Sequence, residues 1–143
     1  MRDFAFNIVK QVSVDLANEP GTFASLTEAL AEANLLIHGI SVESGHSISR
    51  VHFVVNRCDD AVRVLAERGE QVSTREILAV TILQRKVGQI THIARALADA
   101  GINIDTIYLT SAAEGTKPTI YISATRMSAS EVMECLTSAL SDE

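Results

Sequence analysis

The amino-acid sequence predicts an α+β protein made of two copies of one small unit of strands and helices. An apolar helical segment occurs twice, because residues 21–33 (GTFASLTEALAEA) align with residues 88–100 (GQITHIARALADA) at an offset of 67 residues. Runs that alternate apolar and polar residues, the pattern of half-buried strands, flank both copies. The length of 143 residues suits two very small domains, and 47% hydrophobic with 21% charged residues is typical of globular chains.

The first repeat is predicted to contain a strand, a helix, two strands and a second helix, in that order. Val12, Val14 and Leu16 alternate with polar residues in the opening strand. Pro20 suits a helix start, where its missing N–H costs nothing, and Asn34 suits the helix end. The predicted elements are strands at 12–16, 35–42 and 51–55, and helices at 22–33 and 59–69.

The second repeat is predicted to follow the same order. Gly101 ends its first helix, and Ser128 begins its last helix with Glu131 three residues later, which is the spacing of a capping box. The predicted elements are strands at 78–83, 102–109 and 119–124, and helices at 87–100 and from 128 onward.

Two long strands are predicted to serve both repeats. Phe4, Phe6 and Ile8 continue the alternation of the first strand, and neither Gly nor Pro separates the two sets. The second repeat lacks a fourth strand, which residues 4–8 would supply, while residues 72–77 would complete the first sheet. Pairing an otherwise open sheet edge is the physical gain. We expect domains at 1–70 and 71–143.

Charge and composition argue against several classes of function. A net charge of -6 and a pI of about 5.2 repel nucleic acid. Cys58 and Cys135 are far apart in the sequence, and the four histidines do not have the spacing of a metal site. No phosphate-binding loop and no motif of a catalytic nucleophile is present. We therefore predict no catalytic residue, metal ligand or cofactor. Residues 1–10 lack a secretory signal and no apolar run reaches about 20 residues, so we expect a cytoplasmic protein without a membrane partner.

Two motifs resemble those of the ACT-domain family. Asn18-Glu-Pro-Gly-Thr-Phe23 before an apolar helix resembles the family's first loop, and Gly101-Ile-Asn-Ile-Asp105 resembles its second strand. The second repeat is most similar to aspartate kinase regulatory domains, and the first also resembles acetolactate synthase small subunits. The resemblance implies two ferredoxin-like βαββαβ domains packed as an intramolecular pseudo-dimer. It also implies a stand-alone regulatory protein that binds a free amino acid at the domain interface, because no catalytic domain is attached.

The residue types in these motifs suit a small zwitterion. A carboxylate is stabilised by the unpaired N–H groups at a helix start, and a glycine there lets the ligand approach the backbone. Asparagine side chains offer both a donor and an acceptor, and an aspartate can face the ammonium group. The predicted ligand-binding residues are Asn18, Glu19, Pro20, Gly21, Thr22, Phe23, Asn103, Ile104 and Asp105.

The two repeats keep different halves of this pattern. The intact loop lies in the first repeat and the intact strand in the second, so we expect them to form one composite site across an interface. The opposite combination departs from the pattern at both ends, and we expect a weaker or lost second site there. Its residues are Lys86, Val87, Gly88, Gln89 and Ile90 with Ile37, His38 and Gly39.

Plainer interpretations of the same residues stay open at this stage. Residues 18–21 also suit a simple turn, Asn103 a turn residue, Asp105 a solvated strand residue, and Arg85 and Lys86 exposed charges. An acylphosphatase-like enzyme on the same scaffold and a ligand-free assembly module are the competing functions. A homodimer and a separate target enzyme are the expected protein partners.

Overall fold

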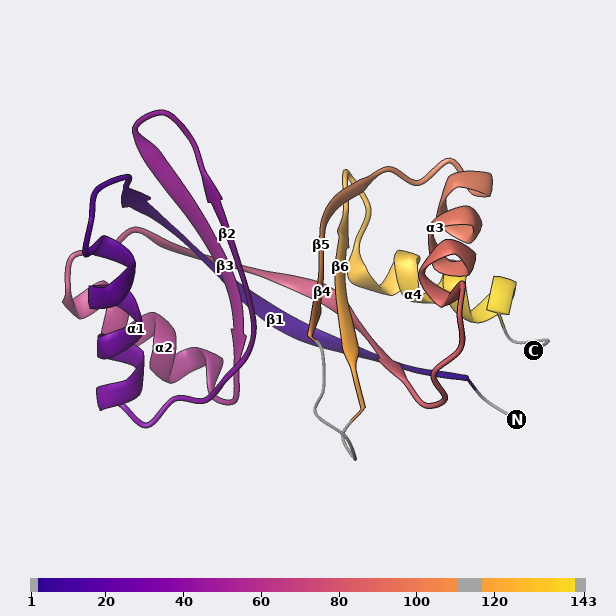
Figure 1. Ribbon diagram of the computed structural model, residues 1–143, viewed down its shortest axis with the longest axis horizontal. Helices are drawn as coiled ribbons and strands as arrows, with labels where there is room; N and C mark the ends of the chain where they lie inside the picture. Colours follow the sequence, from indigo (N-terminus) through magenta and orange to yellow (C-terminus); the bar gives the residue numbers. More distant parts are fainter. Residues whose placement is uncertain (1–2, 111–116, 141–143) are drawn as a thin grey trace. The chain divides into compact units, whose positions relative to one another are not determined.

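The computed structural model describes residues 3–110 and 117–140, and the chain divides into two compact units (Figure 1). The repeat-1 unit is Lys10–Arg75, and the repeat-2 unit is Met1–Val9 with Glu76–Glu143. The elements are β1 (Phe4–Ala17), α1 (Thr22–Glu32), β2 (Ile37–Ser44), β3 (Ile48–Val55), α2 (Cys58–Glu67), β4 (Val72–Ile82), α3 (Gln89–Asp99), β5 (Ile104–Thr110), β6 (Thr119–Ala124) and α4 (Ala129–Leu140).

β1 and β4 each contribute residues to both units, because the division falls inside these two strands. The hydrogen-bonded strand order is β2-β3-β1-β4-β6-β5. No breaker interrupts either strand, so both run on as single extended segments of 14 and 11 residues. The predicted long shared strands are therefore present.

The repeat-1 unit buries the alternating residues of its strands against α1 and α2 (Figure 1). β3 pairs antiparallel with both β1 and β2. Each buried apolar side chain stabilises the unit by about 1.5–3 kcal/mol. The core of this unit consists of Val12, Val14, Leu16, Leu26, Leu30, Leu35, Val51, Phe53, Val55, Ala61 and Leu65.

The repeat-2 unit has its own core between the sheet and helices α3 and α4 (Figure 1). β6 pairs antiparallel with β4 and β5. Phe4, from the start of the chain, is buried in this core and not in the core of the repeat-1 unit. Its fellow members are Leu78, Val80, Ile82, Ile93, Leu97, Ile120, Ile122, Ala124, Val132 and Leu136.

Three helices end in the same way, with one residue in the left-handed conformation and two backbone hydrogen bonds that close the last turn. Asn34, Gly69 and Gly101 have φ of 57°, 82° and 74° and follow α1, α2 and α3. After α1 the Leu35 N–H donates to the Leu30 carbonyl at 3.0 Å, the arrangement of a Schellman motif. The capping box of α4 also forms, since Ser128 and Glu131 each donate a backbone N–H to the other's side chain.

A β-bulge occurs at the same place in both repeats. The β2–β3 register shifts between Ile37 and Gly39, and the β5–β6 register shifts between Ile104 and Thr106. The extra residues, His38 and Asp105, are separated by the offset of the two repeats and are both exposed. Bulges turn a side chain away from the regular pleat and often lie beside functional sites.

No helix in residues 3–110 and 117–140 is long and apolar enough to cross a membrane.

Candidate functional site

The turn before α1 is held by backbone geometry and one hydroxyl group. Gly21 has φ of 92°, which is the left-handed conformation that side chains disfavour. The Thr22 Oγ1 donates to the carbonyls of Ala17 at 2.8 Å and Glu19 at 3.1 Å. No side chain caps the helix, and its first turn has no acidic residue. The helix start therefore presents its positive dipole end with no carboxylate in the first helical turn, while the Thr22 N–H donates to the Glu19 carbonyl at 3.4 Å.

The surface in front of this turn is open. A Cβ placed on Gly21 would meet no atom within 4 Å. Glu19 and Pro20 are exposed, and Phe23 keeps 40% of its surface exposed although it belongs to an apolar helix stripe. A small ligand could thus reach the backbone and the Phe23 ring together.

Asn18 ties the turn to the β2–β3 hairpin. Its Nδ2 donates to the Gly45 carbonyl at 2.9 Å, and its Oδ1 accepts from the Ser49 Oγ at 3.3 Å. Its backbone N–H donates to the Ser47 carbonyl at 3.0 Å. The amide thus has a structural role inside the repeat-1 unit, where it fixes the position of the turn.

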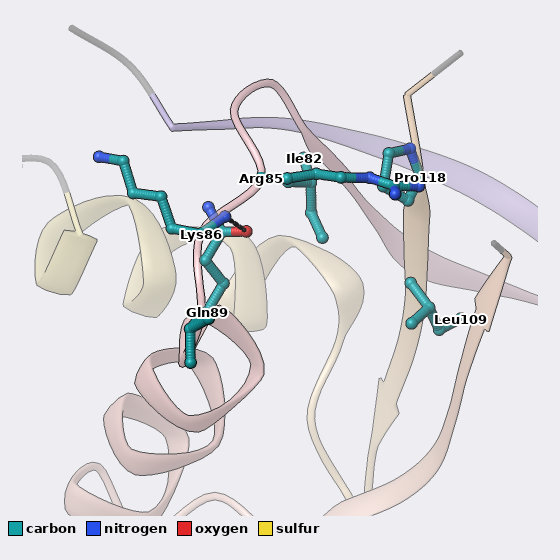
Figure 2. A pocket seen from close by; sticks show the side chains of 7 residues that line it. Ile82, Arg85, Lys86, Gln89, Leu109 and Pro118 are labelled. Carbon is teal, nitrogen blue, oxygen red and sulfur yellow. Dashed lines mark hydrogen bonds between the residues drawn. The ribbon is translucent and has the colours of Figure 1, made fainter. Parts of the chain in front are cut away.

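The loop before α3 has the same backbone geometry and a different side-chain clamp. Gly88 has φ of 90°. The buried Gln89 side chain accepts from the Lys86 N–H at 3.1 Å (Figure 2). It also donates to the Gln84 carbonyl at 2.6 Å. Gln84 and Lys86 stand at the repeat positions of Ala17 and Glu19, so Gln89 bridges the same positions as Thr22.

Lys86 is not simply an exposed charge. Its Nζ lies 3.0 Å and 3.1 Å from the two carboxylate oxygens of Asp3, a residue only 9% exposed. A buried carboxylate without a cation is strongly disfavoured, so this pair fixes the chain start beside the loop within the repeat-2 unit. The sequence carries no signal for the contact, because the partners are 83 residues apart and Asp3 precedes the first strand.

Two hollows adjoin this loop of the repeat-2 unit. One, of about 420 Å³, is lined by Ile82, Arg85, Lys86, Val87, Gln89, Leu109 and Pro118 (Figure 2). The other, of about 220 Å³, is lined by Ile82, Lys86, Gly88, Gln89, Ile90 and Thr91. All five loop residues predicted for the second site therefore border a hollow.

The predicted strand residues lie at the start of β5 and β2. The Asn103 carbonyl accepts from the Thr125 N–H at 2.8 Å, which fixes the start of β5. Ile104 packs against the repeat-2 core, and Asp105 stands exposed in the bulge. In β2 the equivalent segment has Ile37 half-buried, His38 exposed and Gly39 buried.

The predicted residues fall into both units. Asn18–Phe23 and Ile37–Gly39 belong to the repeat-1 unit, whereas Lys86–Ile90 and Asn103–Asp105 belong to the repeat-2 unit. The composite arrangement thus stays a prediction. Within the described residues, no group of three or more His, Cys, Asp or Glu side chains could hold a metal ion.

Solved proteins share this architecture over nearly the whole chain. Protein BT0572 from Bacteroides thetaiotaomicron matches with a TM-score of 0.77 at 21% identity, over 92% of this chain and 88% of that one. The ligand-free regulatory subunit of aspartate kinase from Thermus thermophilus gives 0.70 at 22% identity, over 97% and 95%. The chain has the tandem ACT-domain fold. The sequence resemblance to ACT domains and the two ferredoxin-like units agree with this.

A longer protein contains the same tandem ACT architecture as a part. Aspartokinase III of E. coli, in a structure in complex with lysine and aspartate, gives a TM-score of 0.54 at 12% identity, over 96% of this chain and 33% of that one. No protein-family model and no curated protein matches the sequence.

Proposed function

We propose that this chain is a regulatory protein that binds a free amino acid and is not an enzyme. The tandem ACT fold supports a regulatory role, because the Thermus thermophilus neighbour is the regulatory subunit of a kinase. The aspartokinase III neighbour supports the ligand class, because its structure holds two amino acids.

The observation that carries this proposal is the start of α1. Gly21 adopts the left-handed conformation in front of a helix with no side-chain cap, and a Cβ added to it would meet no atom within 4 Å. The helix N–H groups and the dipole favour an anion there, and a ligand carboxylate supplies one. Phe23 offers an exposed apolar surface two residues away.

Asp105 is the proposed partner of the ligand ammonium group. It is the exposed extra residue of the β5 bulge, and the Asn103 backbone fixes the start of that strand. Because the Asn18 amide bonds the hairpin, we assign Asn18 a positioning role at the turn. The binding residues proposed are Glu19, Pro20, Gly21, Thr22, Phe23, Asn103, Ile104 and Asp105.

The second site is proposed to be weaker. Val87 replaces Pro20 at the matching position. The Lys86 backbone N–H already donates to the Gln89 side chain. His38 replaces Asp105 in the equivalent bulge, so the ammonium group would lose its carboxylate. We expect one tight and one weak or absent site per chain.

Calorimetry with two matched glycine variants tests the proposal. Gly21→Ala and Gly69→Ala lie in the same unit, both have positive φ, and both have open space for a Cβ. Each should lose about 1–2 kcal/mol of stability. Only Gly21→Ala should weaken amino-acid binding, because the added methyl group obstructs the helix N–H groups.

The competing functions predict different results. A first screen measures the thermal shift of the wild-type chain with each of the twenty amino acids. If none raises the melting temperature, the assembly module is favoured. Hydrolysis of acetyl phosphate by the purified chain would instead support the enzyme.

A regulatory role requires that ligand binding to this chain change its interaction with another protein. We propose a homodimer whose geometry the amino acid shifts, with a separate enzyme as target. Light scattering coupled to size exclusion, with and without the amino acid found in the screen, measures the oligomeric state. A monomer under both conditions contradicts the dimer.

A further inference from the structure

The repeat-1 unit is an insertion within the repeat-2 unit. It is one continuous segment, Lys10–Arg75, whereas the repeat-2 unit joins Met1–Val9 to Glu76–Glu143. The chain therefore leaves the repeat-2 unit along β1 and returns to it along β4. The two crossing strands are neighbours in the sheet order, and each crossing point lies inside a continuous strand.

Both crossing strands contribute apolar side chains to two cores. β1 buries Phe4 in the repeat-2 core, although the rest of its core residues belong to the repeat-1 unit. β4 packs Val72 against the repeat-1 core, although its buried core residues belong to the repeat-2 unit. The other core residues on these two strands are Val12, Val14, Leu16, Leu78, Val80 and Ile82. Each strand is thus held at both of its ends by packing.

The start of β1 is fastened to the repeat-2 unit by polar contacts as well. The Asp3 carbonyl accepts from the Leu83 N–H at 2.8 Å, and the Asp3 carboxylate lies 3.0 Å from the Lys86 Nζ. The Phe4 ring lies 6.4 Å from the ring of Phe6, which also packs against the repeat-2 core. Chain ends fray unless such contacts tie them down. The repeat-2 unit therefore keeps a firm hold on the segment that leads into the repeat-1 unit.

An unfolded repeat-1 unit would be a long closed loop as long as the repeat-2 unit stayed folded. Both ends of residues 10–75 would remain fixed beside each other on β1 and β4. Closing a flexible loop of about 65 residues is disfavoured by a factor on the order of 100 relative to a chain with free ends. This cost disappears when the repeat-2 unit unfolds too, because the ends are then released.

We infer that the repeat-1 unit unfolds only together with the repeat-2 unit. β1 and β4 act as a strap, because the folded repeat-2 unit holds both ends of the inserted unit and prevents it from opening alone. A protein that binds and stabilises the repeat-2 unit therefore also stabilises the repeat-1 unit, without touching it.

A consequence for regulation rests on the proposed function. Residues 18–23 of the proposed amino-acid site belong to the repeat-1 unit, so a target enzyme bound to the repeat-2 unit would keep that turn ordered. The coupling itself is measured without any amino acid. A chain that binds no amino acid can still show the coupling, and a chain whose units open separately can still bind one.

Hydrogen exchange of the full chain, followed by NMR without ligand, tests the inference. Leu26 on α1 and Ile93 on α3 stand at the same repeat position and are buried in the repeat-1 and repeat-2 cores. Leu26→Val and Ile93→Val each remove one methylene group from a core and leave β1 and β4 unchanged. The slowest-exchanging amides of β3 and β6 report the opening of the two units. Arg95→Gln, at an exposed position of α3, is the control.

Ile93→Val should speed exchange of the slowest β6 amides by about 2- to 10-fold, and those of β3 by the same factor. Leu26→Val should speed the β3 amides to a similar extent, since it weakens the repeat-1 core directly. Arg95→Gln should leave both strands unchanged. If Ile93→Val speeds exchange in β6 and leaves β3 unchanged, the repeat-1 unit opens by itself and the inference is wrong. Equal acceleration by Arg95→Gln would also overturn it, because the effect would then not depend on the core.

Discussion

The turn before α1 and the loop before α3 each lead into a helix. The two segments have the same backbone conformation at their glycines but different side chains. Gly21 and Gly88 have φ of 92° and 90°. Thr22 bridges the first turn through a hydroxyl group, and Gln89 bridges the second through an amide. The first turn is fastened to its hairpin, whereas the second has a hollow beside it. The same backbone conformation therefore supports two different surfaces. Their chemistry differs because the side chains differ at a few equivalent positions of the two repeats.

The largest expected difference between the two loops is at Lys86 and its counterpart Glu19. Lys86→Gln removes the cation beside the buried Asp3 carboxylate and should destabilise the chain by about 2–3 kcal/mol, less than a fully buried pair because Lys86 is half exposed. Glu19→Gln should change stability by less than about 0.5 kcal/mol, as for an exposed surface residue. Urea unfolding followed by circular dichroism measures both, and equal losses would show that the Asp3 contact adds nothing.

A smaller effect is expected at the two clamps. Gln89→Ala leaves the Lys86 N–H and the Gln84 carbonyl without their partner and should cost about 2 kcal/mol. Thr22→Val removes one half-buried hydroxyl and should cost about 1 kcal/mol. The same unfolding experiment compares them. If Thr22→Val proves the more damaging, the amide clamp is not what holds the second loop.

The two helix-start glycines should respond alike in stability and differently in binding. Gly88→Ala, like Gly21→Ala, places a side chain at positive φ and should cost about 1–2 kcal/mol. Gly101→Ala provides the strain control in the same unit. Calorimetry should show the tight amino-acid site intact in both repeat-2 variants. If only Gly88→Ala lost that site, the tight site would belong to the loop before α3 and not to the turn before α1.

The smallest effect is expected at an ion pair that only the repeat-1 unit has. The Arg50 guanidinium lies 2.8 Å from Asp15 on the neighbouring strand, and this hydrogen-bonded partner lowers the pKa of the Asp15 carboxyl. The equivalent positions in the second repeat are Ile82 and Lys117. Both partners are exposed, so solvent and salt screen the interaction.

The pH dependence of this pair has a definite sign. Because the folded-state pKa of Asp15 is lowered, the pair stabilises the fold above the ordinary aspartate pKa of about 4, and that stabilisation disappears as pH falls through the lowered value. Wild type and Asp15→Asn should differ slightly at pH 7 and converge in acid. A difference that grows on acidification would contradict the assignment.

Local sequence signals predicted most of the elements, because alternation, helical spacing and end residues act over a few positions. Asn34 and Gly101 end their helices as expected, and the Ser128–Glu131 capping box forms. The shared strands were also predictable, since an unbroken alternation leaves no place for a turn.

The features that shape the loops were less accessible. The bulges at His38 and Asp105 depend on strand register, which single-sequence patterns do not fix. The Asp3–Lys86 pair and the Asn18 contacts join segments far apart in the chain. The repeat offset could have indicated Gln89, because it stands where Thr22 stands and has the longer hydrogen-bonding side chain.

The central claim is that residues 18–23 and 103–105 bind the same amino acid. An NMR titration of the ¹⁵N-labelled full chain, with the amino acid found in the thermal screen, measures this directly. We expect the amides of Thr22, Phe23 and Asp105 to shift along binding curves with one shared midpoint, and those of Gly69 and its neighbours to stay still. Separate midpoints for the two segments, or no shift at Thr22 and Phe23, would contradict the claim.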